Sequence, residues 1–379
     1  MRRVVLNATT LVKGGALQAC VSFIREAIAS EANFDWHFLL SIEISEQLRL
    51  FGVDVDSLQG QVISPTPAKN KQSREKLVQT VDQIKPEAVF TFFGPAYVSF
   101  KQPHLMGVAD GWITHSTCLA LKKKGGLVGL LRLAMLFFYK RYWYKKADHW
   151  VVEADCARQG MIKRFGILST NIDIVSNNCG DHYSKSRTEL NLVAPYRCLV
   201  LSAYYPHKNL ELIPYVAAEL KRRRNAEDCI FTLTLEKSSG GEQGLLKTAK
   251  SLGVEKMINN IGPVSVKDGP AHYLQSSLSF MPSLLETFSA VYPESMISGR
   301  PIVTSNLGFA HDVCKDAALY FNPLNADQAA EKIDQLLNDQ ILYNELVEKG
   351  YQVFDNLPSQ RQRYAQYTEV IAAMLKGIR

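Results

Sequence analysis

Residues 281–307 read MPSLLETFSAVYPESMISGRPIVTSNL. They begin at the end of an apolar, β-rich run, LSFM, which Pro282 and Ser283 close as a turn. A segment with helical period follows, from Thr287 to residue 298, and another β-rich run, PIVTS, comes next. This succession of strand, turn, helix and strand predicts a parallel sheet whose strands are connected by helices.

The same alternation continues along the whole chain. In the second half, strands are predicted at CLVLSA, CIFTLTL, LSFMPS and PIVTS, with helices at 208–224, 242–252 and 287–298. In the first half, strands are predicted at 4–6, 36–40, 88–93, 104–108, 150–152 and 172–175, with helices at 15–30 and 154–165. The fold class is therefore α/β, with two Rossmann-like parallel-sheet domains facing a central cleft. Ligands of such sheets bind at the carboxyl ends of the strands.

The length also favours two domains, because 379 residues exceed what one hydrophobic core usually organises. The polar stretch Gly180–Asn191 is the best linker candidate, so we expect a first domain over 1–183 and a second over 184–357. Helices are also predicted at 326–338 and 340–353. Residues 358–379 contain one more helix, which either caps the second domain or packs back on the first.

The composition is that of a globular protein, with 46% hydrophobic and 21% charged residues. The seven cysteines are scattered singly, without a C-x-x-C pair. The N-terminus MRRVVLNATT begins with a strand-like run rather than a signal peptide. We therefore expect no disulfide framework and a reducing, cytoplasmic compartment.

The net charge of +6 is concentrated in one segment, because residues 111–147 contain eight Lys or Arg and no Asp or Glu. The rest of the chain carries a net charge of −2, which argues against general nucleic-acid binding. Residues 121–146 read LKKKGGLVGLLRLAMLFFYKRYWYKK, with 13 mostly apolar residues between two cationic clusters.

This basic aromatic segment is too short to cross a bilayer, which needs about 20 apolar residues. It predicts a helix lying on an anionic membrane surface, with apolar side chains inserted and lysines at the headgroups. The alternative is a buried helix of the first domain with basic ends. The predicted membrane contacts are Lys122, Lys123, Lys124, Lys140, Arg141, Lys145 and Lys146.

Two glutamates in residues 281–307 are candidates for ligand binding. Glu286 lies at the predicted junction of strand and helix, and Glu294 follows eight residues later. Carboxylates at this spacing suit an extended ligand, with one beside a sugar ring and one accepting hydrogen bonds from ribose hydroxyls. Backbone N–H groups at Phe288–Ala290, at a helix N-terminus, would bind phosphate oxygens. The alternative is a helix with a charged first turn, which also favours Glu near its start.

The pattern PS-x-x-E-T-F-x-x-x-x-x-E-x-M-x-x-G-x-P-I-V-x-S resembles the donor-site signature of the family 4 retaining glycosyltransferases. The resemblance extends to Pro206–Leu210 (PHKNL), Ala317–Pro323 (AALYFNP), Asp173–Asn177 (DIVSN) and the pair Gly14-Gly15, so it covers most of the chain. It implies a GT-B fold, with the acceptor bound by residues 1–183 and the nucleotide-sugar by 184–357. It also implies that the enzyme needs no catalytic metal and no other cofactor.

The resemblance places the donor sugar on Glu286, the ribose on Glu294 and the diphosphate on Lys208. The alternative for Lys208 is an ordinary solvated lysine at a helix start. Gly14 and Gly15 match the family's glycine loop, where the backbone approaches the diphosphate or sugar, although a turn alone would also explain them. The other donor-site positions that the resemblance implies are Thr287, Phe288, Ser289 and Ala290.

The chain departs from the family pattern at two positions. Many members carry His-Asp after the strand that here reads HLMGV, and this chain has Ala109 and Asp110. Asp110, and His115 in the loop that follows, are therefore candidate catalytic residues that position donor or acceptor. Many members also carry an arginine where this chain has Ser202, so Lys208 would hold the diphosphate together with another cation.

The sequence thus predicts a metal-independent, retaining glycosyltransferase. It would move a sugar from a nucleotide-sugar donor to a glycan or lipid-linked acceptor in cell-surface polysaccharide synthesis, such as that of lipopolysaccharide. It would work in the cytoplasm, peripherally bound to the inner face of the membrane. The alternatives are a non-catalytic sugar-nucleotide-binding or scaffold protein of the same fold, and another GT-B enzyme such as an epimerase or phosphorylase. The absence of G-x-G-x-x-G counts against an NAD enzyme.

Overall fold

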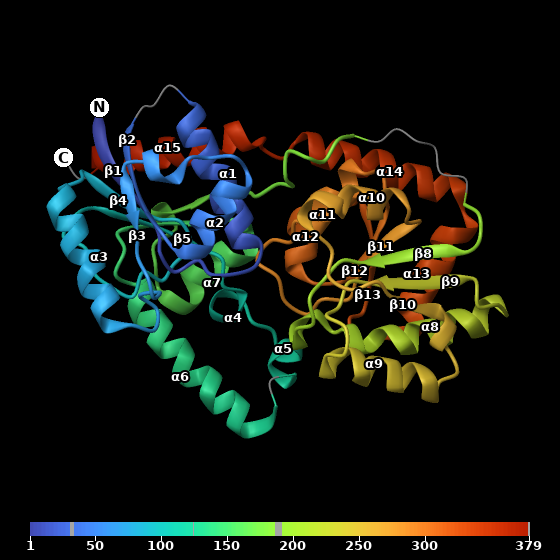
Figure 1. Ribbon diagram of the computed structural model, residues 1–379. Helices are drawn as coiled ribbons and strands as arrows, with labels where there is room; N and C mark the ends of the chain where they lie inside the picture. The colour runs from blue at the N-terminus through green and yellow to red at the C-terminus, as the bar shows by residue number, and fades with distance from the viewer. Residues whose placement is uncertain (31–33, 124, 186–191, 378–379) are drawn as a thin grey trace. The chain divides into compact units, whose positions relative to one another are not determined.

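The computed structural model describes residues 1–30, 34–123, 125–185 and 192–377. The chain divides into two compact units, of which the first comprises 1–115, 127–180 and 358–379 and the second 116–126 and 181–357. Each unit contains one parallel sheet with helices as connections, as the alternation predicts (Figure 1). Residues 116–126 group with the second unit, although they lie inside the range 1–183.

The sheet of the first unit has seven strands in the order β3-β2-β1-β4-β5-β6-β7. The order reverses between β1 and β4, so the strands that precede and follow this point extend to opposite sides. Its elements are β1 (Arg2–Ala8), α1 (Gly15–Ala29), β2 (Phe34–Leu40), α2 (Ile42–Leu50), β3 (Gly60–Val62), α3 (Lys71–Ile84), β4 (Ala88–Thr91), β5 (His104–Val108), α4 (Gly111–Thr114), α6 (Gly126–Tyr144), β6 (His149–Val152), α7 (Asp155–Phe165) and β7 (Ile172–Ile174).

The sheet of the second unit has six strands in the order β10-β9-β8-β11-β12-β13, with the reversal between β8 and β11. Every residue of β11 and β12 is buried, as expected for strands covered on both faces. The elements are α5 (Cys118–Lys122), β8 (Tyr196–Val200), α8 (Ile213–Arg224), β9 (Cys229–Leu233), α9 (Gly240–Ser251), β10 (Ile258–Asn260), α10 (Gly269–Leu274), β11 (Leu278–Met281), α11 (Val291–Ile297), β12 (Ile302–Ser305), α12 (Gly308–Cys314), β13 (Ala318–Phe321), α13 (Ala326–Asn338) and α14 (Gln340–Asp355).

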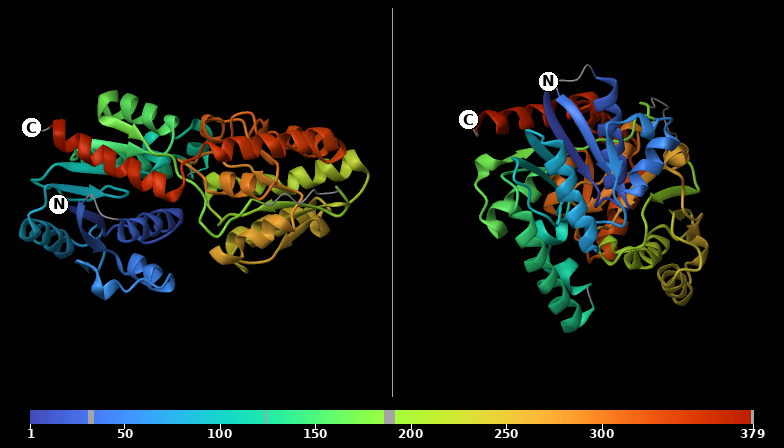
Figure 2. Two further views of the ribbon diagram at one scale, coloured as in Figure 1. Left: turned by 90° about the horizontal axis from the view of Figure 1, so that it is seen from above. Right: turned by 60° about the vertical axis from the view of Figure 1, so that its left-hand side comes forward.

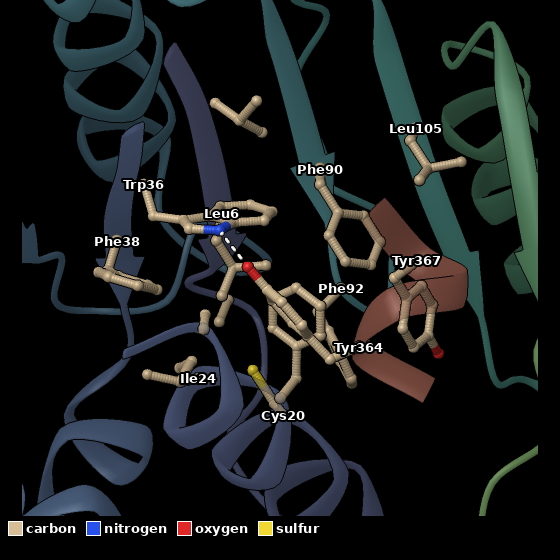
Figure 3. Close-up of a cluster of buried hydrophobic side chains, with 14 of the residues drawn as sticks. Leu6, Cys20, Ile24, Trp36, Phe38, Phe90, Phe92, Leu105, Tyr364 and Tyr367 are labelled. Carbon is tan, nitrogen blue, oxygen red and sulfur yellow. Dashed lines mark hydrogen bonds between the residues drawn. The ribbon is translucent and has the colours of Figure 1, made fainter. Parts of the chain in front are cut away.

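The last helix, α15 (Gln360–Gly377), contributes to the core of the first unit. Its tyrosines Tyr364 and Tyr367 point into a cluster of aromatic side chains (Figure 3). Trp36 Nε1 donates to the hydroxyl of Tyr364 at 3.0 Å, and the rings of Tyr367 and Phe90 lie 5.3 Å apart. Aromatic pairs at this spacing add to the free energy of burial, so α15 stabilises a sheet that lies far from it in sequence.

Residues 126–144 of the basic aromatic segment form α6, which runs away from the sheet of the first unit (Figures 1 and 2). Only Tyr144 is buried in this helix, so the alternative of a core helix is wrong. Large apolar side chains are exposed along it, among them Leu127 at 74%, Met135 at 75% and Phe138 at 68%. In the described part of the chain, no helix is long and apolar enough to cross a membrane.

Candidate functional site

The segment that carries Glu286 and Glu294 leaves β11 as a loop over residues 282–290. The helix was predicted to begin near Thr287, but α11 begins at Val291 and is seven residues long. Pro293 explains the difference, because proline lacks an N–H and is tolerated only in the first turn of a helix. The prediction of a helix N-terminus at residues 288–290 is therefore wrong, and those backbone groups belong to the loop.

The four loop positions predicted at the donor site contribute backbone groups to this turn. Ser289 is buried, and Thr287, Phe288 and Ala290 are partly exposed. The carbonyl of Ser289 accepts from the N–H of Tyr292 at 3.1 Å, and that of Ala290 accepts from the N–H of Glu294 at 3.0 Å. These two hydrogen bonds form the start of α11, and Glu294 lies in the first turn of this helix.

Lys208 and Glu286 form an ion pair at the carboxyl edge of the second sheet. Lys208 lies in the turn after β8, and its Nζ donates to Glu286 Oε1 at 2.6 Å. Both side chains are largely buried, with 17% of the lysine and 11% of the glutamate exposed. The N–H of Leu284 also donates to the carbonyl of His207 at 2.7 Å, which fixes the two loops to each other. Because β8 and β11 flank the reversal of strand order, the pair lies where open α/β sheets bind ligands.

Glu294 has different partners from Glu286. The hydroxyl of Tyr273, on α10, donates to Glu294 Oε2 at 2.9 Å, and Tyr183 also hydrogen-bonds the carboxyl group. Burial raises the pKa of Glu294 to about 7, against the opposing effect of these two hydroxyls. The carboxyl group therefore gains and loses its charge close to neutral pH. Sequence reasoning missed both tyrosines, because neither lies in a recognisable motif.

The glycine loop lies at the equivalent edge of the first sheet. Gly14 caps α1 after β1, next to the reversal between β1 and β4. Its φ of 80° is in the region that favours glycine. A Cβ added at Gly14 or Gly15 would meet nothing within 4 Å, so the backbone here faces open space.

Asp110 and His115 flank α4, at the carboxyl end of β5. Thr114 Oγ1 donates to the carbonyl of Asp110 at 3.0 Å and lies 2.8 Å from His115 Nδ1. The donor and acceptor roles in the contact between the hydroxyl and the ring depend on the tautomer of His115. Nε2 lies 3.8 Å from the Sγ of Cys156.

The carboxylate of Asp110 is paired with a lysine that was predicted to contact the membrane. Lys140 Nζ donates to Asp110 Oδ2 at 2.6 Å. Burial opposes the charge of Lys140, but the attraction and hydrogen bond of Asp110 together raise the pKa of this lysine. Lys140 therefore belongs with Asp110 rather than with the membrane contacts.

The other predicted membrane contacts divide into two groups. Lys123 Nζ lies 3.6 Å from Glu211 Oε2, and Arg141 Nε donates to the carbonyl of Arg164 at 3.0 Å. These two cations thus have partners within the protein. The remaining positions are Lys122, Lys145 and Lys146, which are exposed, and Lys124, which lies outside the described residues.

Ser202 stands where many family members have an arginine, and it supplies no charge. Its N–H donates to Thr234 Oγ1 at 3.1 Å and its hydroxyl to the carbonyl of Ala203 at 2.9 Å. These bonds shape the loop after β8 that leads to Lys208.

Lys208→Ala is expected to weaken the binding of a nucleoside diphosphate roughly ten- to a hundredfold, the usual loss of affinity when a charge-assisted hydrogen bond is removed. The matching nucleoside should bind with little change, because it lacks the diphosphate. Calorimetry with both ligands measures the difference. Lys267→Ala, an exposed lysine of the same unit, is the control. Equal losses for the two ligands would show that Lys208 does not contact the diphosphate.

Comparison with known proteins finds a glycosyltransferase family match within the second unit. Residues 185–353 match the family described as Glycosyl transferases group 1. The chain is 22% identical over 218 residues to the O-antigen chain mannosyltransferase RfbU of Salmonella typhimurium. This alignment covers 56% of the chain and 58% of RfbU, so the chain matches just over half the length of that relative.

Two solved structures show the same fold over the whole chain. A glycosyltransferase from Rickettsia africae superposes with a TM-score of 0.73 and 14% identity, covering 99% of each chain. HepE of Anabaena, solved in complex with UDP, superposes with a TM-score of 0.71 and 14% identity, covering 98% of this chain and 100% of HepE. Residues 185–353 of this protein therefore form a glycosyl transferases group 1 domain, in a chain that has the two-sheet GT-B fold.

Proposed function

We propose that this protein is a retaining glycosyltransferase that transfers a sugar from a nucleotide-sugar to a glycan or lipid-linked acceptor in cell-surface polysaccharide synthesis. The observation that carries the proposal is the Lys208–Glu286 pair at the strand-order reversal of the group 1 domain. The name of RfbU, an O-antigen mannosyltransferase, and the UDP bound to HepE support the acceptor class and the donor class.

The two residues of the ion pair would contact the two sides of the bond that breaks, which joins the donor sugar to the diphosphate. Lys208 would stabilise the negative charge that develops on the departing diphosphate, and Glu286 would accept hydrogen bonds from the donor sugar. In a retaining transfer the bond from the anomeric carbon to the diphosphate breaks, and the bond to the acceptor oxygen forms on the same face. The acceptor proton passes to the leaving diphosphate. Asp110 and His115 would position the acceptor or donor from the first unit.

A lysine that carries this charge makes a metal unnecessary, so we propose that the reaction needs no metal or other cofactor. Glu294 would hold the ribose, and the backbone at Gly14 and Gly15 would approach the diphosphate or sugar. Both glycines leave room for such an approach, because a Cβ there would meet no other atom.

We also propose that α6 docks the protein on an anionic membrane surface. Its exposed apolar side chains are accompanied by exposed cations, in α6 or near it in sequence, that would pair with lipid headgroups: Lys122, Arg132, Lys145 and Lys146. A surface that combines exposed apolar and cationic side chains binds anionic bilayers through both effects. Docking of this kind would keep the enzyme on the inner face of the membrane, next to a lipid-linked acceptor.

The test begins with a thermal-shift screen of UDP-, GDP- and dTDP-sugars. A donor present at a hundred times its Kd stabilises the folded protein by about 2.7 kcal/mol. Release of nucleotide from that donor is then measured with and without an acceptor, in buffer containing EDTA. Acceptor-dependent release is expected, and EDTA should leave it intact.

Other outcomes of the same test point to other functions. Binding without release would indicate a non-catalytic scaffold, and conversion of the donor without an acceptor would indicate an epimerase. Activity that EDTA abolishes and Mg²⁺ or Mn²⁺ restores would contradict the metal-independent mechanism.

A further inference from the structure

Glu294 sits in a cradle of two phenol groups within the second unit. Tyr273, on α10, is fully buried and donates to Glu294 Oε2 at 2.9 Å. Tyr183, which precedes β8 by 13 residues, is 8% exposed and bonds the same carboxyl group. The two rings are 5.9 Å apart and nearly perpendicular, at 70°.

The surrounding backbone holds both tyrosines in place. The buried guanidinium of Arg300 donates to the carbonyl of Tyr273 at 2.8 Å and to that of Leu274 at 3.0 Å, which fixes the end of α10. At the start of the same helix, a Cβ on Gly269 would lie 2.2 Å from the hydroxyl of Tyr183. A side chain larger than hydrogen at position 269 would therefore push Tyr183 away from Glu294.

The identity of these partners determines what Glu294 can bind. A carboxylate has about four lone-pair sites, so two phenol donors leave acceptor capacity for two more hydroxyls. Phenols are neutral, and they orient the carboxylate without cancelling its charge. Arg300, the nearby cation, is instead bonded to backbone carbonyls and to the hydroxyl of Tyr343. Such a site suits the 2′- and 3′-hydroxyls of a ribose.

We propose that Tyr273 and Tyr183 are positioning residues that hold the Glu294 carboxylate as a preformed acceptor for the ribose hydroxyls of the donor nucleotide. This inference rests on the proposed function, in which Glu294 faces the ribose. It extends that function to two residues outside the donor-site pattern of residues 282–305. It also predicts how donor binding depends on pH.

The pH dependence follows from the groups that face Glu294. These are Tyr273 from α10 and Tyr183 from the segment before β8. Arg300 donates to the carbonyl of Tyr273, and the ring of His182 contacts that of Tyr183. Burial raises the pKa of Glu294 to about 7, and the two hydroxyls act in the opposite direction. A diol binds best to the ionised form, which accepts at both oxygens. Nucleotide affinity should therefore fall as the pH drops through 7.

The experiment compares wild type, Tyr273→Phe and Tyr183→Phe by calorimetry between pH 5.5 and 8.5. The ligands are UDP, or whichever nucleoside diphosphate binds the wild type, and its 2′-deoxy form. Tyr343→Phe is the control, because Tyr343 is also a buried tyrosine of the second unit, and its hydroxyl donates to the carbonyl of Ser277 at 2.7 Å and bonds Arg300 rather than Glu294.

In wild type we expect up to tenfold weaker binding per pH unit below the midpoint, and at pH 8 a roughly tenfold or greater preference for the ribonucleotide. Tyr273→Phe and Tyr183→Phe should each raise the pH midpoint of nucleotide binding by about one unit, because each removes one hydrogen-bond donor to the charged carboxylate. Each should also reduce the preference for the ribonucleotide over its 2′-deoxy form. The control should keep the wild-type midpoint and preference.

Two results separate failure of the inference from failure of the proposed function. If wild type binds a nucleoside diphosphate and both cradle variants keep its midpoint and ribose preference, the tyrosines do not position Glu294. If wild type binds no nucleoside diphosphate at any pH, the proposed function fails instead. Thermal melts confirm that each variant is folded, and the two separate variants provide the test if one of them is not.

Discussion

Glu286→Ala is expected to lower turnover roughly 10²–10³-fold, the usual effect of removing one electrostatic contact from a transition state. Nucleoside diphosphate affinity should hold or increase. We expect this affinity because Lys208 Nζ donates to Glu286 Oε1 at 2.6 Å in the wild type, so the carboxylate competes with the diphosphate for the lysine. Without the carboxylate, the lysine is released to the diphosphate. The variant would thus bind product-like ligands well while losing the contact to the reacting sugar.

Single-turnover rates and nucleoside diphosphate titrations of the same preparation measure the two effects. Glu294→Ala is the comparison, because it should weaken nucleotide binding and change the rate at saturating donor much less. Glu286→Gln separates charge from hydrogen bonding, since the amide retains an acceptor for a sugar hydroxyl. If Glu286→Ala and Glu294→Ala lose affinity and turnover in equal measure, the division of roles between them is wrong.

Exchanging the four exposed cations near α6 for glutamine should release the protein from anionic vesicles. The residues are Lys122, Arg132, Lys145 and Lys146. Attraction to an anionic surface is worth about 1 kcal/mol for each basic residue near it, so even two contacts shift partitioning more than tenfold. Binding of the wild type should also weaken at high salt, because such charges are screened over about 8 Å at physiological ionic strength.

The apolar part of the surface is tested separately by changing Leu131, Met135 and Phe138 to serine, since all three side chains are exposed. Flotation with phosphatidylserine vesicles gives the readout for both variants. The matched control removes four exposed lysines from another part of the first unit: Lys69, Lys71, Lys76 and Lys85. It has the same net charge as the cation variant and should float like wild type.

A water-soluble acceptor should still be used by both helix variants, whereas a lipid-linked acceptor in vesicles should be used poorly. Wild-type protein that stays unbound at low salt would overturn the membrane assignment. Self-association that the serine variant abolishes would show that α6 contacts a second copy of the chain instead.

Much of the donor site was predictable because its signals are local. Glu286, Glu294 and Lys208 each lie directly after or near a strand whose apolar run is visible in the sequence. Parallel strands end at one edge of a sheet, so residues that follow them meet there. The start of α11 was predicted four residues too early, because the period of apolar side chains extends through the loop and only Pro293 marks the first turn.

The partners of these residues were not predictable, because they come from segments without a motif. Tyr273 lies 21 positions from Glu294, and Lys140 lies 30 from Asp110. Side chains at such separations meet only through the packing of whole helices on a sheet. A lysine in a basic cluster looks the same in sequence whether it faces lipid or, like Lys140, turns back to a carboxylate.

The sequence by itself determined the alternation of strands and helices, the two-sheet architecture and the chemistry of the donor segment, since apolar period and turn residues act over a few neighbouring positions. The strands β3, β10 and β13 and the helices α2 and α3 were not predicted. The tertiary structure alone decided which charges have partners and which surfaces are exposed. It pairs Lys208 with Glu286, holds Glu294 between two tyrosines and leaves the apolar side chains of α6 uncovered. The physical reason is that ion pairing and burial depend on distances between elements, which strand order and helix packing set across the whole sheet.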